Sequence, residues 1–253
     1  FLLPKVLAIS LVMISTLIGG ALVGLAGQVF KGYFNFELGK VLVWLILPQS
    51  IDFILLDVLA IFFQAISPNR FAGWGLMVLY MISTFTFASL GLEHNLYNYG
   101  GAPQVTASDM NGLGRFWIGA WWFRLYWSFF AVILVALSYA VWQRGAEGRL
   151  WPRFRRAPSR LGGVVGLIML VAVVGFAGVG GCIFLNTNVW NDFRTNKDND
   201  RWMGEYERVL VKERHFDKVP QPKIESMKLD VDLRPHEPML RVTGTYVLRN
   251  MTN

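Results

Sequence analysis

The stretch that decides the fold is LGGVVGLIMLVAVVGFAGVGGCIFLNTNVWNDFRTNKDND, residues 161–200. Its residues are apolar or small up to position 185, and its polar and charged residues begin at Asn186. Four further long apolar stretches precede it, and 67 residues rich in charge follow Asn186. Long apolar stretches are typical of membrane helices, whereas a charged segment needs water. The chain is therefore predicted to occupy two media, a bilayer for residues 1–186 and water for residues 187–253.

Composition and charge support this division. The chain of 253 residues is 54% hydrophobic and 16% charged, whereas soluble domains have about 25% charged residues. Residues 1–186 hold 12 Lys or Arg and 6 Asp or Glu, and residues 187–253 hold 12 and 11, so +6 of the net charge of +7 belongs to the apolar part. This excess lies in loops beside apolar runs, which indicates membrane orientation and argues against nucleic acid as a partner. The single cysteine, Cys182, excludes an internal disulfide and a cysteine metal site.

Five stretches are long and apolar enough for a transmembrane helix, which needs about 20 such residues. They are residues 6–30, 41–66, 71–92, 116–142 and 161–185. The second contains Pro48, Asp52 and Asp57 and is the least regular of the five. The predicted fold is a mainly α polytopic membrane helix bundle of about five transmembrane helices, followed by the start of a β-rich soluble domain.

The Lys and Arg residues of the short loops predict the orientation, because they concentrate on the cytoplasmic side. Six arginines lie between the fourth and fifth stretches, namely Arg144, Arg149, Arg153, Arg155, Arg156 and Arg160. Lys5 and Arg70 bring this side to eight cations, and the opposite side has Lys31, Lys40 and Arg115. Loops 31–40 and 93–115 and the tail after Asn186 are therefore expected outside the cytoplasm.

Small residues predict where the helices pack. Gly20 and Gly24 form one GxxxG pair and Gly162 and Gly166 form another, which is followed by Gly175, Gly178 and Gly181. Such faces let two helices approach closely in lipid, so these glycines indicate contacts between helices and no chemistry.

Charged residues within the apolar stretches are the candidate functional residues, because a central charge is costly in lipid. Arg124 has two interpretations: its side chain extends past Trp121 to the outer interface, or it forms an ion pair in a cavity, with Asp52 as one candidate partner. Asp52 and Asp57 are five residues apart, hence about 140° apart around a helix. This spacing argues against a paired-carboxylate site and favours a polar cavity or partners on different helices, with a proton relay as the alternative.

The tail alternates apolar and polar residues. Met227, Leu229, Val231 and Leu233 have charged residues between them, and a second run from Leu240 to Leu248 repeats the pattern after the turn at Pro235–Pro238. A period of two is typical of half-buried strands. Because a lone hairpin is only marginally stable in water, we expect these strands to open a larger β domain. The chain is accordingly expected to be an internal piece of a longer protein.

Two groups of residues resemble a known family. Residues 90–97, LGLEHNLY, and 107–114, ASDMNGLG, resemble bacterial type-2 ABC exporter permeases, as does the upstream loop 32–39, GYFNFELG. In that group the permease is fused to a domain similar to aminopeptidase N-like zinc metallopeptidases. Residues 228–233, KLDVDL, and 244–250, GTYVLRN, resemble its first strands.

The resemblance implies a function and partners. The expected protein is the membrane-spanning permease segment of an ABC exporter, in the bacterial inner membrane, fused to an outward metallopeptidase-like domain. Its expected partners are the lipid bilayer, a separate ATPase subunit that uses ATP, and a second permease half or copy. Loop 93–115 matches the re-entrant element of such permeases, so Glu93, His94, Ser108, Asp109 and Asn111 are candidates for an outer gate, with Ser108 or Asp109 capping a short helix.

Two alternatives stay open. In the first, the helices only anchor an outward zinc aminopeptidase and transport nothing; in the second, they form a membrane scaffold. The segment itself contains no HExxH motif after Glu93-His94 and no P-loop at Gly39-Lys40. No catalytic residue, metal ligand or cofactor site is therefore expected within it, and zinc is expected only in the downstream domain.

Overall fold

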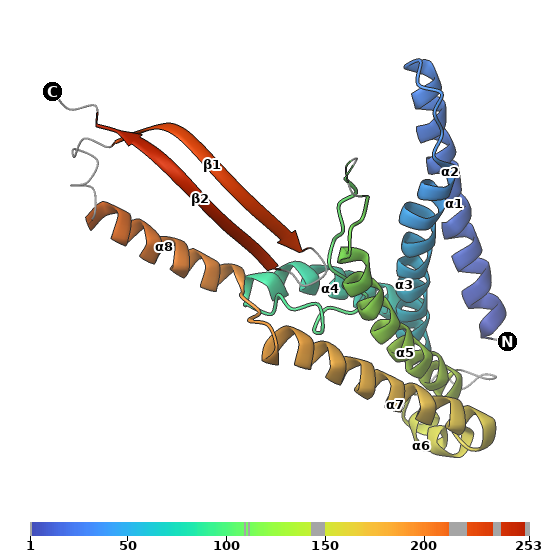
Figure 1. Ribbon diagram of the computed structural model, residues 1–253. Coiled ribbons are helices and arrows are strands. Elements are labelled where there is room, and N and C mark those ends of the chain that lie inside the picture. The colour runs from blue at the N-terminus through green and yellow to red at the C-terminus, as the bar shows by residue number, and fades with distance from the viewer. Residues whose placement is uncertain are drawn as a thin grey trace. The chain divides into compact units, whose positions relative to one another are not determined.

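The computed structural model describes residues 2–108, 110, 112–142, 150–212, 222–234 and 239–250. It is mainly helical, with one two-stranded sheet near the C-terminus (Figure 1). The chain forms two compact units, Phe1–Asn196 and Lys197–Asn253. The elements are α1 Leu3–Phe30, α2 Leu38–Lys40, the π-helical η1 Val41–Ile46, α3 Leu47–Ile66, α4 Arg70–Ser89, α5 Phe116–Val141, α6 Leu150–Arg160, α7 Gly163–Phe184, the π-helical η2 Leu185–Val189, α8 Asn196–Lys212, β1 Lys223–Arg234 and β2 Met239–Arg249.

The described residues contain four helical segments long and apolar enough to cross a membrane: Leu3–Phe30, Leu38–Ile66, Phe116–Val141 and Gly163–Val189. They coincide with four of the five predicted stretches, which fits a membrane protein. The remaining stretch, 71–92, is helical as α4, and its crossing of a membrane stays a prediction. The segment between α5 and α7, expected as a loop, contains the amphipathic helix α6 over its described residues.

The helix Leu38–Ile66 runs through Pro48 by widening its turns. Pro48 has no N–H, and its ring would clash with the carbonyl four residues earlier, that of Trp44. The backbone from Val41 to Ile46 is π-helical, and only Leu47 separates this segment from the proline. A π-helical turn inserts extra backbone length, so the chain passes the proline without ending the helix. This accounts for the irregularity predicted for the second stretch.

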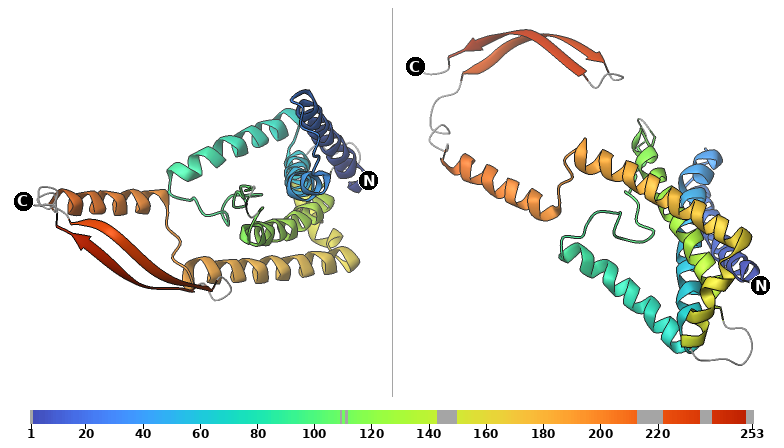
Figure 2. Two further views of the ribbon diagram at one scale, coloured as in Figure 1. Left: turned by 45° about the horizontal axis from the view of Figure 1, so that its top comes forward. Right: turned by 90° about the horizontal axis from the view of Figure 1, so that it is seen from below.

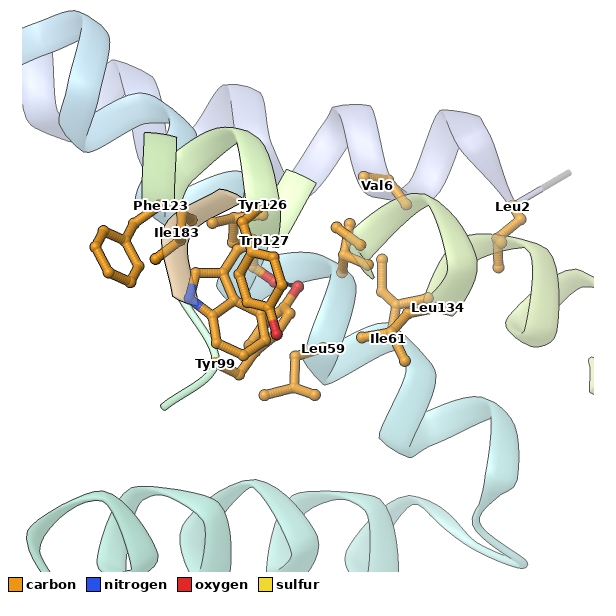
Figure 3. Close-up of a cluster of buried hydrophobic side chains, with 13 residues drawn as sticks. Leu2, Val6, Leu59, Ile61, Tyr99, Phe123, Tyr126, Trp127, Leu134 and Ile183 are labelled. Atoms are coloured by element: carbon orange, nitrogen blue, oxygen red, sulfur yellow. Dashed lines mark hydrogen bonds between the residues drawn. The ribbon is translucent and has the colours of Figure 1, made fainter. Parts of the chain in front are cut away.

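The first unit is a bundle with α5 at its centre. Helix α5 packs against α3 and α7, and α1 packs against α3. The core includes Leu55 of α3. It also includes Leu59 of α3, Phe123 and Trp127 of α5, and Tyr99 of the loop after α4 (Figure 3). Helix α4 diverges from this bundle, and the loop after it returns to α5 (Figure 2). The bundle is thus closed by a non-helical segment.

Most apolar side chains of α1 and α7 face outward. The buried residues of α1 are Val6 and Ser10, and those of α7 are Ala172 and Ile183. Exposed apolar surface on this scale would be costly in water and suits lipid. The two outer helices therefore present the faces expected of a membrane bundle.

The predicted glycine contacts differ from the observed ones. A Cβ on Gly20 or Gly24 would meet no atom within 4 Å, so neither glycine packs against another helix in the described part of the chain. Gly162 and Gly166 lie near backbone oxygens of the preceding turn, Ser159 and Leu161. The close approach of helices occurs further along α7, where Gly175 meets the ring of Phe129 and Gly180 that of Tyr126. Gly175 belongs to the predicted small-residue series, whereas Gly180 was missed because its partner is an aromatic ring and not a second small face.

Gly180 provides a test of this packing. A Cβ there would lie 2.8 Å from an atom of the Tyr126 ring. The centre of that ring lies 4.3 Å from the ring centre of Phe176 and 4.6 Å from that of Trp127, so the Tyr126 ring is confined. We expect Gly180→Ala to lower the free energy of unfolding by about 1–3 kcal/mol through overpacking. Gly178→Ala is the control, since its Cβ would meet no atom within 4 Å. Equal thermal unfolding of the two variants in the same detergent would contradict the α5–α7 contact.

The second unit confirms the strand prediction. β1 and β2 pair antiparallel, with a bulge between Ile224 and Ser226. The register sets Met227 opposite Tyr246, Val231 opposite Val242 and Leu233 opposite Leu240, so the alternating apolar residues share one face. Every residue of both strands is exposed. The turn at 235–238 lies outside the described residues, and α8 shows that the polar stretch after the bundle is partly helical.

Candidate functional site

Arg124 and Asp52 form a two-pronged ion pair between α5 and α3. Arg124 Nε donates to Asp52 Oδ1 at 2.9 Å, and Nη2 donates to Oδ2 at 2.8 Å. The side chains are 15% and 25% exposed. Parallel hydrogen bonds of this kind fix the orientation of both groups and are stronger than neutral ones. Of the two interpretations of Arg124, the structure contains the ion pair, with the guanidinium carbon also 5.9 Å from the Trp121 ring centre.

The ion pair lines a pocket of about 570 Å³, here called the Arg124 pocket. Its walls come from the second helical segment, from α5 and from the loop after α4. Polar groups are contributed by the ion pair and by Gln49 and Gln104. The remaining lining residues are Val43, Trp44, Pro48, Gly100, Ala102, Pro103, Val105, Leu113, Trp117, Ala120, Trp121 and Gly101. A pocket of this size with a few convergent polar groups is typical of a ligand site.

Side-chain hydrogen bonds to backbone carbonyls tie the loop after α4 to the bundle. Tyr99 Oη donates to the Leu55 carbonyl at 2.9 Å, and Trp127 Nε1 donates to the Gly101 carbonyl at 3.1 Å. Tyr80 Oη donates to the Tyr99 carbonyl at 2.7 Å. Burial, with the neighbouring Tyr80, raises the pKa of the Tyr99 phenol, so its hydroxyl stays a donor. These bonds satisfy a non-helical segment against α3, α4 and α5, which is required of irregular backbone beside a membrane bundle.

Asp57 lies apart from this pocket, as its spacing from Asp52 predicts. Ser10 Oγ of α1 donates to Asp57 Oδ2 at 2.9 Å, and both residues are buried. The two aspartates therefore have partners on different helices, which is one of the two interpretations that their spacing favours. A proton relay through them stays a prediction.

Glu93 and His94 join the loop to the end of the first unit. His94 Nε2 lies 3.0 Å from Thr187 Oγ1 in η2. The ring of His94 packs edge-on against that of Phe193, with 4.5 Å between the two ring centres. Glu93 Oε2 accepts from the Asn196 backbone N–H at 2.8 Å. Because these contacts hold residues 187–196 to the loop, the first compact unit extends past the change of composition at Asn186.

The bonds of His94 define its protonation state. Leu96 N–H donates to Nδ1 at 3.1 Å, so Nδ1 carries no proton. Thr187 Oγ1 donates to the Ile183 carbonyl at 2.8 Å and therefore accepts the proton of Nε2. A second proton on Nδ1 would face the Leu96 N–H directly. Burial also lowers the pKa of the His94 imidazole, so the folded chain holds this ring neutral.

Acidification should therefore weaken the His94 contacts. The unfolded imidazole has a pKa of about 6.5, and the folded value lies below it. The unfolded state then binds the proton first, so stability is complete above about pH 6.5 and falls as the pH drops towards the folded pKa. We expect His94→Gln, which cannot titrate, to flatten this dependence. Thermal unfolding at about pH 7.5 and about pH 5.5 tests it, and identical pH dependence of both proteins would contradict it.

Ser108 caps a tight turn and no helix. Ser108 and Gly112 exchange two backbone hydrogen bonds of 2.8 Å, and Ser108 Oγ accepts from the Met110 N–H at 3.2 Å. Gly112 has φ +64°, which the turn requires and glycine adopts without strain. The expected short helix is therefore replaced by a bridge that presents exposed Met110. Asp109 and Asn111 lie outside the described residues, so their part in a gate stays a prediction.

Sequence reasoning missed two features of the site. The residues at the Arg124 pocket include Trp44 and Trp117, which hydropathy does not relate to Asp52 or Arg124. Arg153 was counted for orientation, yet it is buried and donates to the carbonyls of Ala65 and Ser67. Among the described residues, no group of three or more His, Cys, Asp or Glu could hold a metal ion. Comparisons with protein-family models, curated proteins and solved structures found no match for this chain.

Proposed function

We propose that residues 1–186 are the membrane-spanning permease segment of an ABC exporter. The supporting observation is the Arg124 pocket, a polar cavity inside an apolar bundle, walled in part by non-helical loop backbone. A helix bundle that only anchors a domain gains nothing from an ion pair and a cavity in this place, since intramembrane charges are costly. A permease needs both, because a polar path must open between its helices.

The proposal includes an orientation. The bundle lies in a bacterial inner membrane, with α6 in the cytoplasm and residues 187–253 outside. A cytoplasmic ATPase subunit binds ATP and contacts the α3–α4 turn and α6, whose Arg155 is exposed. The permease is completed by a second half or copy.

Association with the ATPase is the direct test. The full-length protein, extracted in a mild detergent, should retain an ATPase subunit, and Arg155→Glu should weaken this association. Arg115→Glu is the matched control, since Arg115 is also exposed but lies on the predicted outer side. The exporter proposal would be overturned if no ATPase subunit is associated with the protein and if export is unchanged when the gene is deleted.

Orientation has a separate test. Single cysteines at Ser159 and Asp200, each exposed, are introduced in a Cys182→Ala background. An impermeant maleimide on intact spheroplasts should label Asp200→Cys and spare Ser159→Cys. The reverse result would put the tail in the cytoplasm.

The peptidase-like domain is the second candidate, and the hairpin favours it. The shared apolar face of β1 and β2 is exposed throughout, and such a face needs a further layer to cover it. We propose that this layer is the rest of a metallopeptidase-like β domain with its zinc ligands downstream. The anchor alternative holds if two results are obtained together. The unaltered full-length protein exports nothing, and its peptidase activity is kept when residues 1–142 are replaced by an unrelated anchor.

A further inference from the structure

The ion pair of the Arg124 pocket has unused hydrogen-bonding capacity. A guanidinium has five N–H donors, and Arg124 spends one on Nε and one on Nη2. Among the described residues, no other side-chain hydrogen bond of Arg124 is formed. Each carboxylate oxygen of Asp52 accepts one bond and has room for another. The pocket therefore offers donors and acceptors side by side, in fixed geometry.

The charge of the site selects the ligand. Arg124 and Asp52 are the only charged residues that line the pocket in the described part of the chain, so its net charge is zero. An anion without a cationic group would be attracted by Arg124 but repelled by Asp52. A cation without an anionic group would be attracted by Asp52 but repelled by Arg124. A ligand that carries both an anionic group and an ammonium group satisfies both partners at once. The pocket is thus complementary to a zwitterion.

The position of the pocket indicates a membrane-bound ligand. Trp44, Trp117 and Trp121 line it, and tryptophan concentrates at the depth of lipid headgroups. Arg124 lies eight residues into α5, hence about 12 Å along the helix from its start. A headgroup drawn into this crevice would stay close to the interface.

A second cavity lies next to the pair along the same two helices. This groove, of about 710 Å³, is lined almost wholly by apolar side chains of α1, α3, α5 and α7. On α3 it includes Leu55, and on α5 it includes Ser128, each within one turn of the ion pair. Apolar surface so close to a polar site suits an acyl chain attached to the zwitterion.

We propose that the Arg124 pocket binds the phosphoethanolamine headgroup of a membrane phospholipid, with its phosphate on Arg124, its ammonium on Asp52 and an acyl chain in the adjacent groove. Both charged groups keep partners when the lipid is bound, so the ion pair is retained and extended. The proposal does not depend on transport, because it holds equally for a permease and for an anchor.

Lipid selectivity tests the site. The purified chain is reconstituted in nanodiscs with equal amounts of phosphatidylethanolamine and phosphatidylglycerol, and the lipid retained is measured by native mass spectrometry. The wild-type chain should retain phosphatidylethanolamine with about tenfold preference, the effect of one charge-assisted contact. Asp52→Asn leaves Arg124 uncompensated and should reverse the preference towards the anionic lipid, whereas Arg124→Gln should abolish phosphate binding. Asp57→Asn, on the same helix but outside both cavities, is the matched control and should keep the wild-type preference.

The same experiment distinguishes a phospholipid headgroup from a free zwitterion as the ligand. Retention of the lipid against excess soluble phosphoethanolamine assigns a phospholipid, and its displacement assigns a free zwitterion at the same pair; both support the site. Equal retention of the two lipids by the wild-type chain would overturn it, and this result needs no variant to fold. An unchanged preference in folded Asp52→Asn would overturn it as well.

Discussion

Replacing Asp52 with alanine is expected to lower the free energy of unfolding of the bundle by about 3 kcal/mol, the cost of leaving a mostly buried charge without its partner. Arg124 is 15% exposed and makes two hydrogen bonds to Asp52, so the variant strands a charged guanidinium between α3 and α5. The measurement is chemical or thermal unfolding of the purified chain in one detergent. Unchanged stability would show that water or lipid compensates Arg124 as well as Asp52 does.

Two comparisons separate this effect from a general loss of an acidic group. Glu37→Ala removes the acid of an exposed pair with Lys40, whose side chains are 50% and 48% exposed, and should change stability by less than about 1 kcal/mol. The double variant Asp52→Asn with Arg124→Gln removes both charges and keeps both volumes. Because no uncompensated charge remains, it should be more stable than either single variant.

The partners of the charged residues were predictable to the extent that helix geometry decides them. A spacing of five residues places the carboxylates of Asp52 and Asp57 on different faces, and the structure pairs one with α5 and the other with Ser10 of α1. The pocket itself was not predictable. It depends on Trp127 of α5 bonding the Gly101 carbonyl of a loop 26 residues away, and hydropathy carries no signal for such a contact.

Strand register was accessible for a similar reason. Alternation puts Met227, Val231 and Leu233 on one face, and the observed pairing of Val231 with Val242 keeps both apolar sets together, whereas a shift by one residue would separate them. The glycine contacts were less accessible. Gly20 and Gly24 satisfy the spacing rule yet face open space, while Gly180 meets an aromatic ring, because the rule describes one helix and says nothing about the shape of its neighbour.

The arginine-rich segment between α5 and α7 shows how a charge pattern can hide a structural role. Counting cations there predicts orientation, but residues 150–160 also place Trp151, Phe154 and Ala157 three apart, a helical spacing that indicates an amphipathic helix. On that helix Arg153 is 5% exposed, whereas Arg155 faces outward. The three-residue spacing of the apolar side chains was the signal available in the sequence. The arginines between them drew attention to orientation instead.

Arg153→Ala is expected to be the second strongly destabilising change. The Arg153 side chain donates to the Ala65 carbonyl at 3.1 Å and to the Ser67 carbonyl at 3.2 Å. Both carbonyls belong to buried residues at the end of α3, where the helix has no further N–H to bond them. Removing the guanidinium leaves them unpaired and opens a cavity, so we expect a loss of about 2–3 kcal/mol.

Two further variants identify the cause of that loss. Arg155→Ala removes an exposed arginine two residues away on the same helix and should change stability by less than about 0.5 kcal/mol. Arg153→Lys keeps the charge but loses the planar fork that reaches two carbonyls, so it should recover only part of the loss. Since Arg153 ties α6 to the end of α3, its loss should also expose the turn between α3 and α4 to proteolysis. Full stability of Arg153→Lys would show that the positive charge near the C-terminus of α3, rather than the paired hydrogen bonds, holds α6 in place.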